Sequence, residues 1–190
     1  IVNSAGEYML GDIVVEEAKK AVAGAADVKL ETKRFIGAFY GDFFAGVNLI
    51  GALLQMFAVS RIFQFMGVRG ALFILPVIAF MGYTSLALVP LLGVVKVAKT
   101  LENATDYSIQ NTARQALFLP TSREAKYKAK AAIDSFFMRF GDVISAGIVY
   151  LGTERLHWGA MHFAWINAAL AIVWLWIVWQ LGEMHKKRGF

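Results

Sequence analysis

Long apolar runs separated by short polar stretches dominate the pattern along the chain. From 70 to 95 there is no charged residue, and the run from 156 to 182 is uncharged apart from two histidines and holds all five tryptophans. A third run, 35–59, is broken only by three polar residues, Asp42, Asn48 and Gln55. About 20 largely apolar residues are enough for a helix to cross a bilayer. The runs lack the period-two alternation of a membrane barrel, so the pattern predicts an all-α integral membrane protein.

Weaker, more polar runs at 93–119 and 133–152 add two further helices, and Pro90 predicts a turn inside the long uncharged stretch. The opening residues are apolar but too short to cross, which indicates a partial first helix in a piece of a longer protein. An interfacial helix is the alternative. The small and charged residues of 18–34 indicate an amphipathic or irregular connection on the outside. The predicted organisation is one six-helix domain over 1–190, with helices at about 1–15, 35–60, 70–88, 91–118, 128–152 and 157–183.

Composition changes the picture only by excluding other classes. The hydrophobic share is 58%, the charged share is 17% and the mean hydropathy is +0.55. Soluble domains carry about 25% charged residues, so the expected partner of this surface is a lipid bilayer. The chain has no cysteine, its three histidines form no spaced ligand set, and it contains no phosphate-binding or hydrolase motif. We therefore expect no cofactor, no metal site and no enzymatic activity.

A polar stripe runs along the predicted helix 91–118. Its members recur at spacings of three and four: Lys99, Glu102, Asn103, Asp106, Tyr107, Gln110 and Arg114. A charge that faces lipid at bilayer depth costs about 2.5–3.5 kcal/mol, so the stripe must face protein or a water-filled cavity. Two plainer interpretations stay open. The end near Arg114 leaves the membrane, or Lys99 and Glu102 only neutralise each other as a structural pair.

Other predicted helices repeat this polarity. The fifth pairs Lys130 with Asp134 and Arg139 with Asp142, the second carries Asp42, and the first carries Glu7. The third and sixth are apolar throughout and are interpreted as lipid-facing scaffold. Helices one, two, four and five would then line a central path, an allocation that resembles half of a transporter of the major facilitator superfamily.

Basic residues set the expected orientation. Ten Lys/Arg lie in three segments that would share a side if the six helices alternate, against six on the other side. The excess predicts that the first side is cytoplasmic, with the C-terminus inside and the protein in a bacterial inner (plasma) membrane. The sequence pI of about 9.5 reflects these flanks. No nucleic-acid partner is expected, because no basic stripe with interleaved aromatics occurs.

Short sequence motifs give a closer resemblance to a known family. "YGDF" (40–43) followed by "VSRIFQFMGV", "DYSIQNTARQALFLP" (106–120) and "KYKAKAAID" (126–134) are similar to the ATP/ADP antiporter, or nucleotide transporter, family. The resemblance implies the C-terminal half of a twelve-helix transporter, whose N-terminal half is in the same or another chain. It also implies that Glu7 is the acidic residue of the seventh helix in that family. The sequence departs from the family where Thr112, Arg114 and Gln115 replace a Pro-x-Lys-Glu pattern.

The resulting hypothesis is a carrier of an anionic solute, a nucleotide exchanged as ATP for ADP, by alternating access. Basic side chains would bind phosphates, Arg in bidentate fashion, and acidic ones would pair with them when the site is empty. The candidate substrate-binding residues are Glu7, Asp42, Lys96, Lys99, Glu102, Asp106, Asn111, Lys130, Asp134 and Arg139. Two alternatives remain. One is a proton- or cation-coupled carrier of another small solute. The other is a non-transporting scaffold, in which the membrane charges are mutually paired and no cavity exists.

Overall fold

The computed structural model describes residues 1–119 and 122–187, and within them the chain is about 90% helical with no strand. The prediction of an all-helical chain is therefore confirmed for this part. The α-helices are α1 (Val2–Ala21), α2 (Val28–Leu53), α3 (Val59–Leu88), α4 (Leu92–Thr105), α5 (Asn111–Ala116), α6 (Arg123–Ala132), α7 (Met138–Tyr150) and α8 (Ala160–Lys187). Four π-helical turns join some of them: η1 (Leu54–Ala58), η2 (Asp106–Gln110), η3 (Ile133–Phe137) and η4 (Leu151–Arg155).

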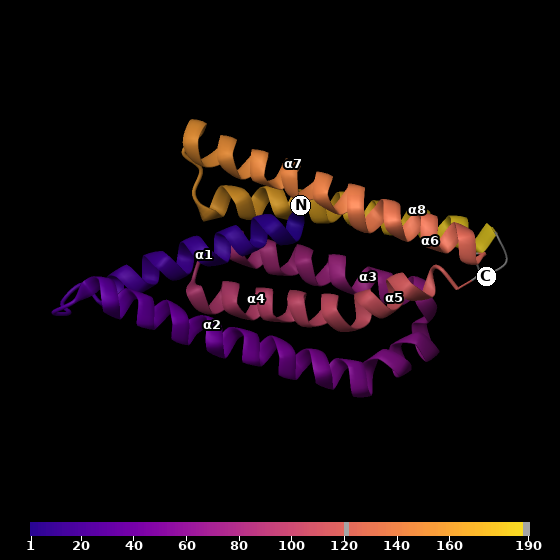
Figure 1. Ribbon diagram of the computed structural model, residues 1–190, viewed down its shortest axis with the longest axis horizontal. Helices are drawn as coiled ribbons and strands as arrows, with labels where there is room; N and C mark the ends of the chain where they lie inside the picture. Colours follow the sequence, from indigo (N-terminus) through magenta and orange to yellow (C-terminus); the bar gives the residue numbers. More distant parts are fainter. Residues whose placement is uncertain (120–121, 188–190) are drawn as a thin grey trace.

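The π-turns make the helices longer than their labels indicate. Helices α4, η2 and α5 form one rod over 92–116, and α6, η3, α7 and η4 form another over 123–155. Helices α2, η1 and α3 are also continuous, but Gly67 has φ 66° and ψ −177°, which breaks the helix there. Glycine reaches this backbone conformation without a Cβ penalty. Figure 1 shows the chain reversing near this point, so that α3 runs back beside α4.

The connection at 18–34, expected to be amphipathic or irregular, is mostly helical, with a short non-helical turn at 22–27. Helix α1 continues to Ala21, and α2 begins at Val28. The carboxylate of Asp27 caps α2 by accepting a hydrogen bond from the Leu30 N–H at 3.0 Å. One turn later, Arg34 pairs with Glu31 at 2.8 Å. Charged residues thus extend the helix beyond its apolar run, which hydropathy alone does not detect.

The turn predicted at Pro90 is confirmed. Helix α3 ends at Leu88 and α4 begins at Leu92. Proline has no N–H to donate, and it disfavours the helical conformation of the residue before it. Val89 accordingly leaves the helix, with φ −137° and ψ 83°.

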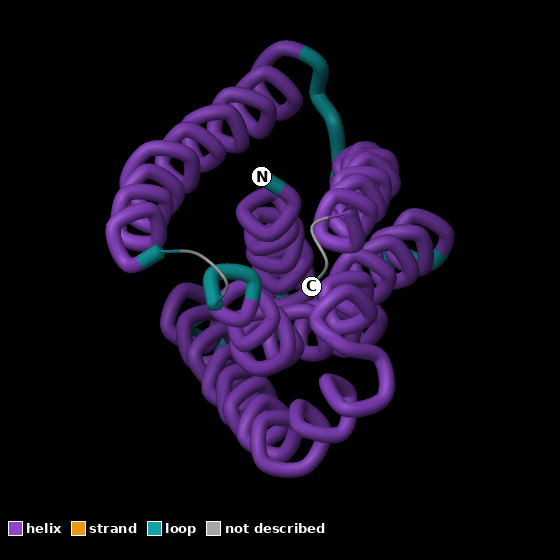
Figure 2. The backbone as a smooth tube through the Cα atoms, turned by 90° about the vertical axis from the view of Figure 1, so that its right-hand side faces the viewer, coloured by secondary structure: helices purple, strands orange, loops and turns teal. Residues whose placement is uncertain are grey.

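The core lies among α1, α2, α3, α4 and α8. Helix α3 packs along α8 and α4, α2 packs on α4, and α1 contacts α2, α4 and α8. Fully buried side chains from four of these helices meet there, including Phe43, Met9, Leu86 and Phe163. The rod of α6 and α7 is set apart from this core in Figure 2, and its contact with the rest is chiefly between α7 and α1.

The connections separate into two ends of the molecule. In Figure 1 the connections at 22–27, 89–91 and 156–159 lie toward the left. The bend at Gly67, the end of α5 and the end of α8 lie toward the right. The described basic residues of the first two segments in the orientation argument are therefore at one end.

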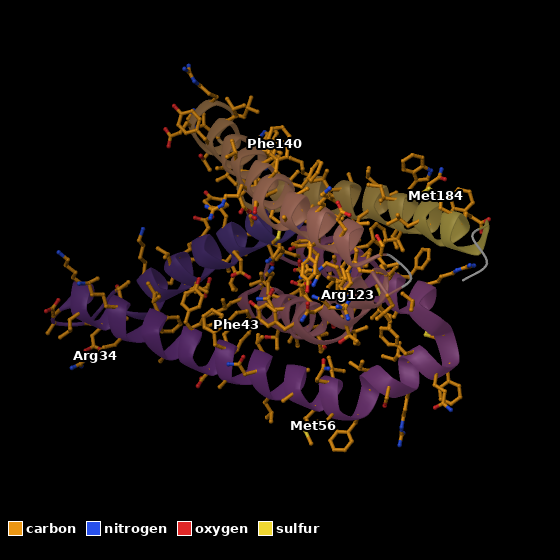
Figure 3. The ribbon with its side chains drawn as sticks, turned by 45° about the vertical axis from the view of Figure 1, so that its right-hand side comes forward. Arg34, Phe43, Met56, Arg123, Phe140 and Met184 are labelled. Atoms are coloured by element: carbon orange, nitrogen blue, oxygen red, sulfur yellow. The ribbon has the colours of Figure 1, made fainter. Side chains whose placement is uncertain are left out.

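Much of the outer surface is apolar. Met56, Phe65 and Phe140 are 70%, 82% and 54% exposed, and Figure 3 shows Met56 and Phe140 pointing away from the bundle. Large exposed apolar patches mark membrane or protein contacts. Two helical segments of the described residues are long and apolar enough to cross a membrane, Val28–Leu88 and Ala160–Met184. The first contains the break at Gly67 and covers two of the predicted helices.

Candidate functional site

A buried polar network is centred on Lys99 of α4, whose exposed fraction is 1%. Its ammonium donates to Asn3 Oδ1 at 2.7 Å and to Glu102 Oε2 at 3.0 Å. Glu7 Oε1 of α1 lies 3.3 Å from the same nitrogen. An ammonium has three N–H donors; the hydrogen bonds to Asn3 and Glu102 use two of them, and Glu7 faces the same nitrogen as an ion-pair partner. In this arrangement Lys99 is therefore engaged by three groups of the protein itself.

The predicted scaffold helices also contribute to this network, which corrects the assignment of the third and sixth helices as purely apolar. Tyr83 of α3 donates its hydroxyl to Glu102 Oε2 at 2.8 Å. Asn167 of α8 donates to the backbone carbonyl of Val2 at 3.0 Å. These bonds tie α3 and α8 to α1 and α4.

Close approach of the helices depends on Gly6 of α1. A Cβ at this position would lie 2.0 Å from the Tyr83 hydroxyl oxygen and 3.0 Å from Lys99 Nζ. Only glycine leaves the space that these two polar groups occupy. Small residues have the same role at helix contacts in other membrane proteins, where close backbone approach replaces the hydrophobic driving force.

The network satisfies the charges that sequence analysis placed at bilayer depth. Glu102 is 5% exposed and accepts from both Lys99 and Tyr83. Glu7 is half-buried and also accepts from Asn103 Nδ2 at 3.0 Å. Lys99 and Glu102 therefore do form the structural pair that was one of the two open interpretations.

A cavity of about 530 Å³ lies beside this network. It opens between the beginning of α1, the α4–η2–α5 rod, α7 and α8. Its apolar wall includes Leu75, Leu170, Trp174 and Phe137, and its charged lining residues are Glu102, Asp106, Arg114 and Asp142. A pocket with a mostly apolar wall and a few convergent polar groups is the usual form of a small-molecule site.

The charged groups of the cavity differ in how they are engaged. Glu102 is bonded within the network, and Asp142 accepts a hydrogen bond from the Ser4 hydroxyl at 3.1 Å. Asp106 is half-buried and has no hydrogen bond or ion pair within the described part of the chain. It begins the π-turn η2, and such turns frequently occur at functional sites. Asp106 is thus the carboxylate most available to a ligand.

A second, smaller cavity of about 350 Å³ lies on another side of the same rod. It is lined by α2–η1 and by η2–α5, and its polar lining residues are Asn48, Gln55, Tyr107, Asn111 and Thr112. The predicted site residue Asn111 belongs here, and it also accepts from Arg114 at 3.4 Å. The two cavities show that the polar stripe faces both sides of its helix.

Four of the remaining predicted site residues, Asp42, Lys96, Lys130 and Arg139, take part in neither the network nor the lining of the two cavities. Asp42 and Arg139 are exposed, on α2 and α7. Lys96 is half-buried, with its ammonium 5.2 Å from the centroid of the Phe39 ring. Lys130 donates to Gln115. The side chain of Asp134 lies outside what the structure describes. The structure therefore brings together Glu7, Lys99, Glu102 and Asp106, and not the whole predicted set.

Sequence analysis missed Tyr83, Asn167 and Trp174 as lining or network residues. A signal for two of them was present, because Tyr83 and Asn167 are polar groups inside otherwise apolar spans. Such residues usually face the interior of the bundle and find a partner there. The partner itself could not be read from spacing, because it lies on another helix.

Comparisons with known proteins agree with this membrane-type architecture. The model of the family described as "TLC ATP/ADP transporter" matches residues 46–185, most of the chain. No curated protein matches the chain. No solved structure matches it either.

Proposed function

Because the chain belongs to the TLC ATP/ADP transporter family, we propose that it moves a nucleotide across a membrane, exchanging ATP for ADP. In this proposal the chain is the C-terminal half of a transporter of the major facilitator type and works with an N-terminal half. It acts as a carrier and not as an enzyme. Its basic end faces the cytoplasm of a bacterial inner membrane, as the excess of Lys and Arg there favours.

The observation that carries the proposal is the family match over 46–185, because this segment contains the α4–η2–α5 rod. That rod supplies Glu102, Asp106 and Arg114 to the larger cavity. A guanidinium offers bidentate hydrogen bonds to a phosphate, and an apolar wall suits a nucleobase. The cavity thus has both kinds of surface that a nucleotide requires.

The packing also supports a mechanism of alternating access. The Lys99 network joins α1, α3, α4 and α8 into one body, whereas the α6–α7 rod contacts this body chiefly through α1. A site between two bodies is exposed to one side or the other when they rock about it. The larger cavity lies at this boundary, with Met138 and Gly141 of α7 in its wall.

The test is exchange in proteoliposomes that contain the full-length protein. Proteoliposomes loaded with ADP are expected to take up labelled ATP faster than protein-free vesicles. They are also expected to take it up faster than proteoliposomes without internal nucleotide. Uptake equal to that of protein-free vesicles under both conditions would refute nucleotide transport.

One observation favours a second candidate, a proton- or cation-coupled carrier of another small solute. The larger cavity has three carboxylates, Glu102, Asp106 and Asp142, but only one cationic side chain among its described lining residues, Arg114. An imposed pH gradient separates the two candidates. It should drive uptake by a coupled carrier without internal nucleotide, and it should leave a strict exchanger unchanged. The cavity, and an Asp106 without a hydrogen bond or ion pair among the described residues, favour a transporter over a non-transporting scaffold.

A further inference from the structure

We propose that the larger cavity binds the nucleotide in one orientation, with the base at Asp106 and the phosphates at Arg114. This inference rests on the proposed function and assigns the specificity-determining group within that site. The Asp106 carboxylate accepts a hydrogen bond from the exocyclic amino group of the base. The site therefore selects adenine by its amino group.

The charges of the cavity support this orientation. Glu102 accepts hydrogen bonds from Lys99 and Tyr83, both on Oε2, and Asp142 accepts one from Ser4 on Oδ1, whereas Asp106 accepts none from the described residues. Asp106 is then the carboxylate of the cavity with the most free acceptor positions, and an ionised carboxylate can accept hydrogen bonds but cannot donate them. It would repel a phosphate, whereas an amino group supplies the donor that it lacks. Arg114 is the one cationic side chain among the described residues of the lining, so the phosphates belong at its end.

Asp106 and Arg114 lie eight residues apart on one rod. In a regular α-helix eight residues would turn Arg114 by about 80° away from Asp106. The wider turn of η2 delays this rotation, and both side chains line the same cavity. One ligand in this cavity therefore contacts both groups.

The wall between the two groups suits a flat ring. Trp174 of α8 is half-buried, and it lines the cavity together with Leu170 and Leu75. Bases stack on aromatic side chains without regard to their identity, because every base has a π-face. The apolar wall therefore holds the base, and Asp106 distinguishes one base from another.

The experiment compares ATP with purine riboside triphosphate, which lacks the amino group and adds no other donor. With the full-length protein in proteoliposomes, the wild type is expected to prefer ATP at least tenfold by initial rate. Asp106→Asn should reduce this preference to less than threefold. The asparagine side chain can itself donate a hydrogen bond to the base, so the site no longer depends on a donor from the base. Arg114→Gln should slow both nucleotides and leave the ratio unchanged. Asp12→Asn, an exposed carboxylate on α1, is the matched control and should change neither rate nor ratio.

A competitor without phosphates tests the orientation independently. Adenosine should inhibit ATP uptake by the wild type and by Arg114→Gln at the same concentration, and should inhibit Asp106→Asn more weakly. If a variant does not transport, equilibrium binding to the purified protein measures its preference for ATP over purine riboside triphosphate and its inhibition by adenosine. An unchanged ATP preference in Asp106→Asn, or a changed one in Arg114→Gln, overturns the orientation while nucleotide transport by the wild type stands. No nucleotide transport by the wild type refutes the proposed function itself.

Discussion

Replacing Lys99 by methionine tests whether the buried network holds the helices together. Methionine has a similar length and fits an apolar interior, so the change removes mainly the charge and its three contacts. Glu102 then keeps only the hydrogen bond from Tyr83, at 2.8 Å. Glu7 keeps the hydrogen bond from Asn103, at 3.0 Å.

The burial of each partner sets the expected size of the effect. Removing one partner of a buried ion pair costs about 3–5 kcal/mol, because the other charge stays buried without compensation. Glu102 is 5% exposed but retains one hydrogen bond. The stability lost when Glu102 loses Lys99 should therefore be near the lower end of this range. The pair with Glu7, whose side chain is 38% exposed, adds at most about 1 kcal/mol. We expect Lys99→Met to lower the free energy of unfolding by about 3–4 kcal/mol.

The assay is reversible unfolding of the full-length protein in mixed micelles, followed by tryptophan fluorescence during a denaturant titration. Lys99→Met combined with Glu102→Gln removes both charges and should recover most of the loss, because a neutral replacement of a buried pair is often tolerated. Lys96→Met is the matched control, three residues earlier on α4. Its ammonium lies over the Phe39 ring at 5.2 Å, and its loss should cost about 0.5–1 kcal/mol. The reasoning is refuted if Lys99→Met is no more harmful than Lys96→Met, or if the double variant is as unstable as the single one.

Three further changes are checked by the same titration. Gly6→Ala should lower stability by about 1–3 kcal/mol, because the new Cβ would lie 2.0 Å from the Tyr83 hydroxyl; adding Tyr83→Phe should cost less than the two separate effects predict. Asn167→Leu should cost about 1–3 kcal/mol, since it removes the donor that lies 3.0 Å from the Val2 carbonyl; a cost below that of Lys96→Met would contradict this. Asp27→Ala should cost about 1 kcal/mol by removing the cap of α2, and Asp27→Asn, which still caps, should cost less.

The helical architecture was predictable because an apolar run long enough to cross a bilayer can form few structures other than a helix. The ends of the helices were less predictable. Helix α2 starts at Val28 because Asp27 caps it and Glu31 pairs with Arg34, neither of which a hydropathy window measures. The π-turns were not predictable at all, since they depend on how a long rod fits its neighbours and not on a residue pattern.

The candidate site was predictable on one helix and not across helices. The spacing of Lys99, Glu102 and Asp106 placed them on a polar stripe, and the structure shows Lys99 and Glu102 buried and Glu102 and Asp106 lining a cavity. Spacing could not show that Tyr83 would reach Glu102 from a helix that looked apolar. Nor could it show that Asp42 would be exposed. A polar residue on α2 does not by itself indicate that its side chain faces the bundle.

The polar stripe has two different roles at two positions along the α4–η2–α5 rod. Its first part, Lys99 with Glu102, packs against α1 and α3, so these charges stabilise the packing, and Glu102 also lines the larger cavity. Its second part, from Asp106 onward, follows a π-turn and opens to a cavity. A transport cycle that pulled α1 from α4 would cost Lys99 its contacts with Asn3 and Glu7 and leave it paired with Glu102 of its own helix. Motion of the α6–α7 rod against that body avoids this cost, because no network bond reaches Lys99 from the described side chains of α6 or α7. In the proposed cycle, variants of Lys99 therefore change stability, whereas variants of Asp106 change which nucleotide is carried.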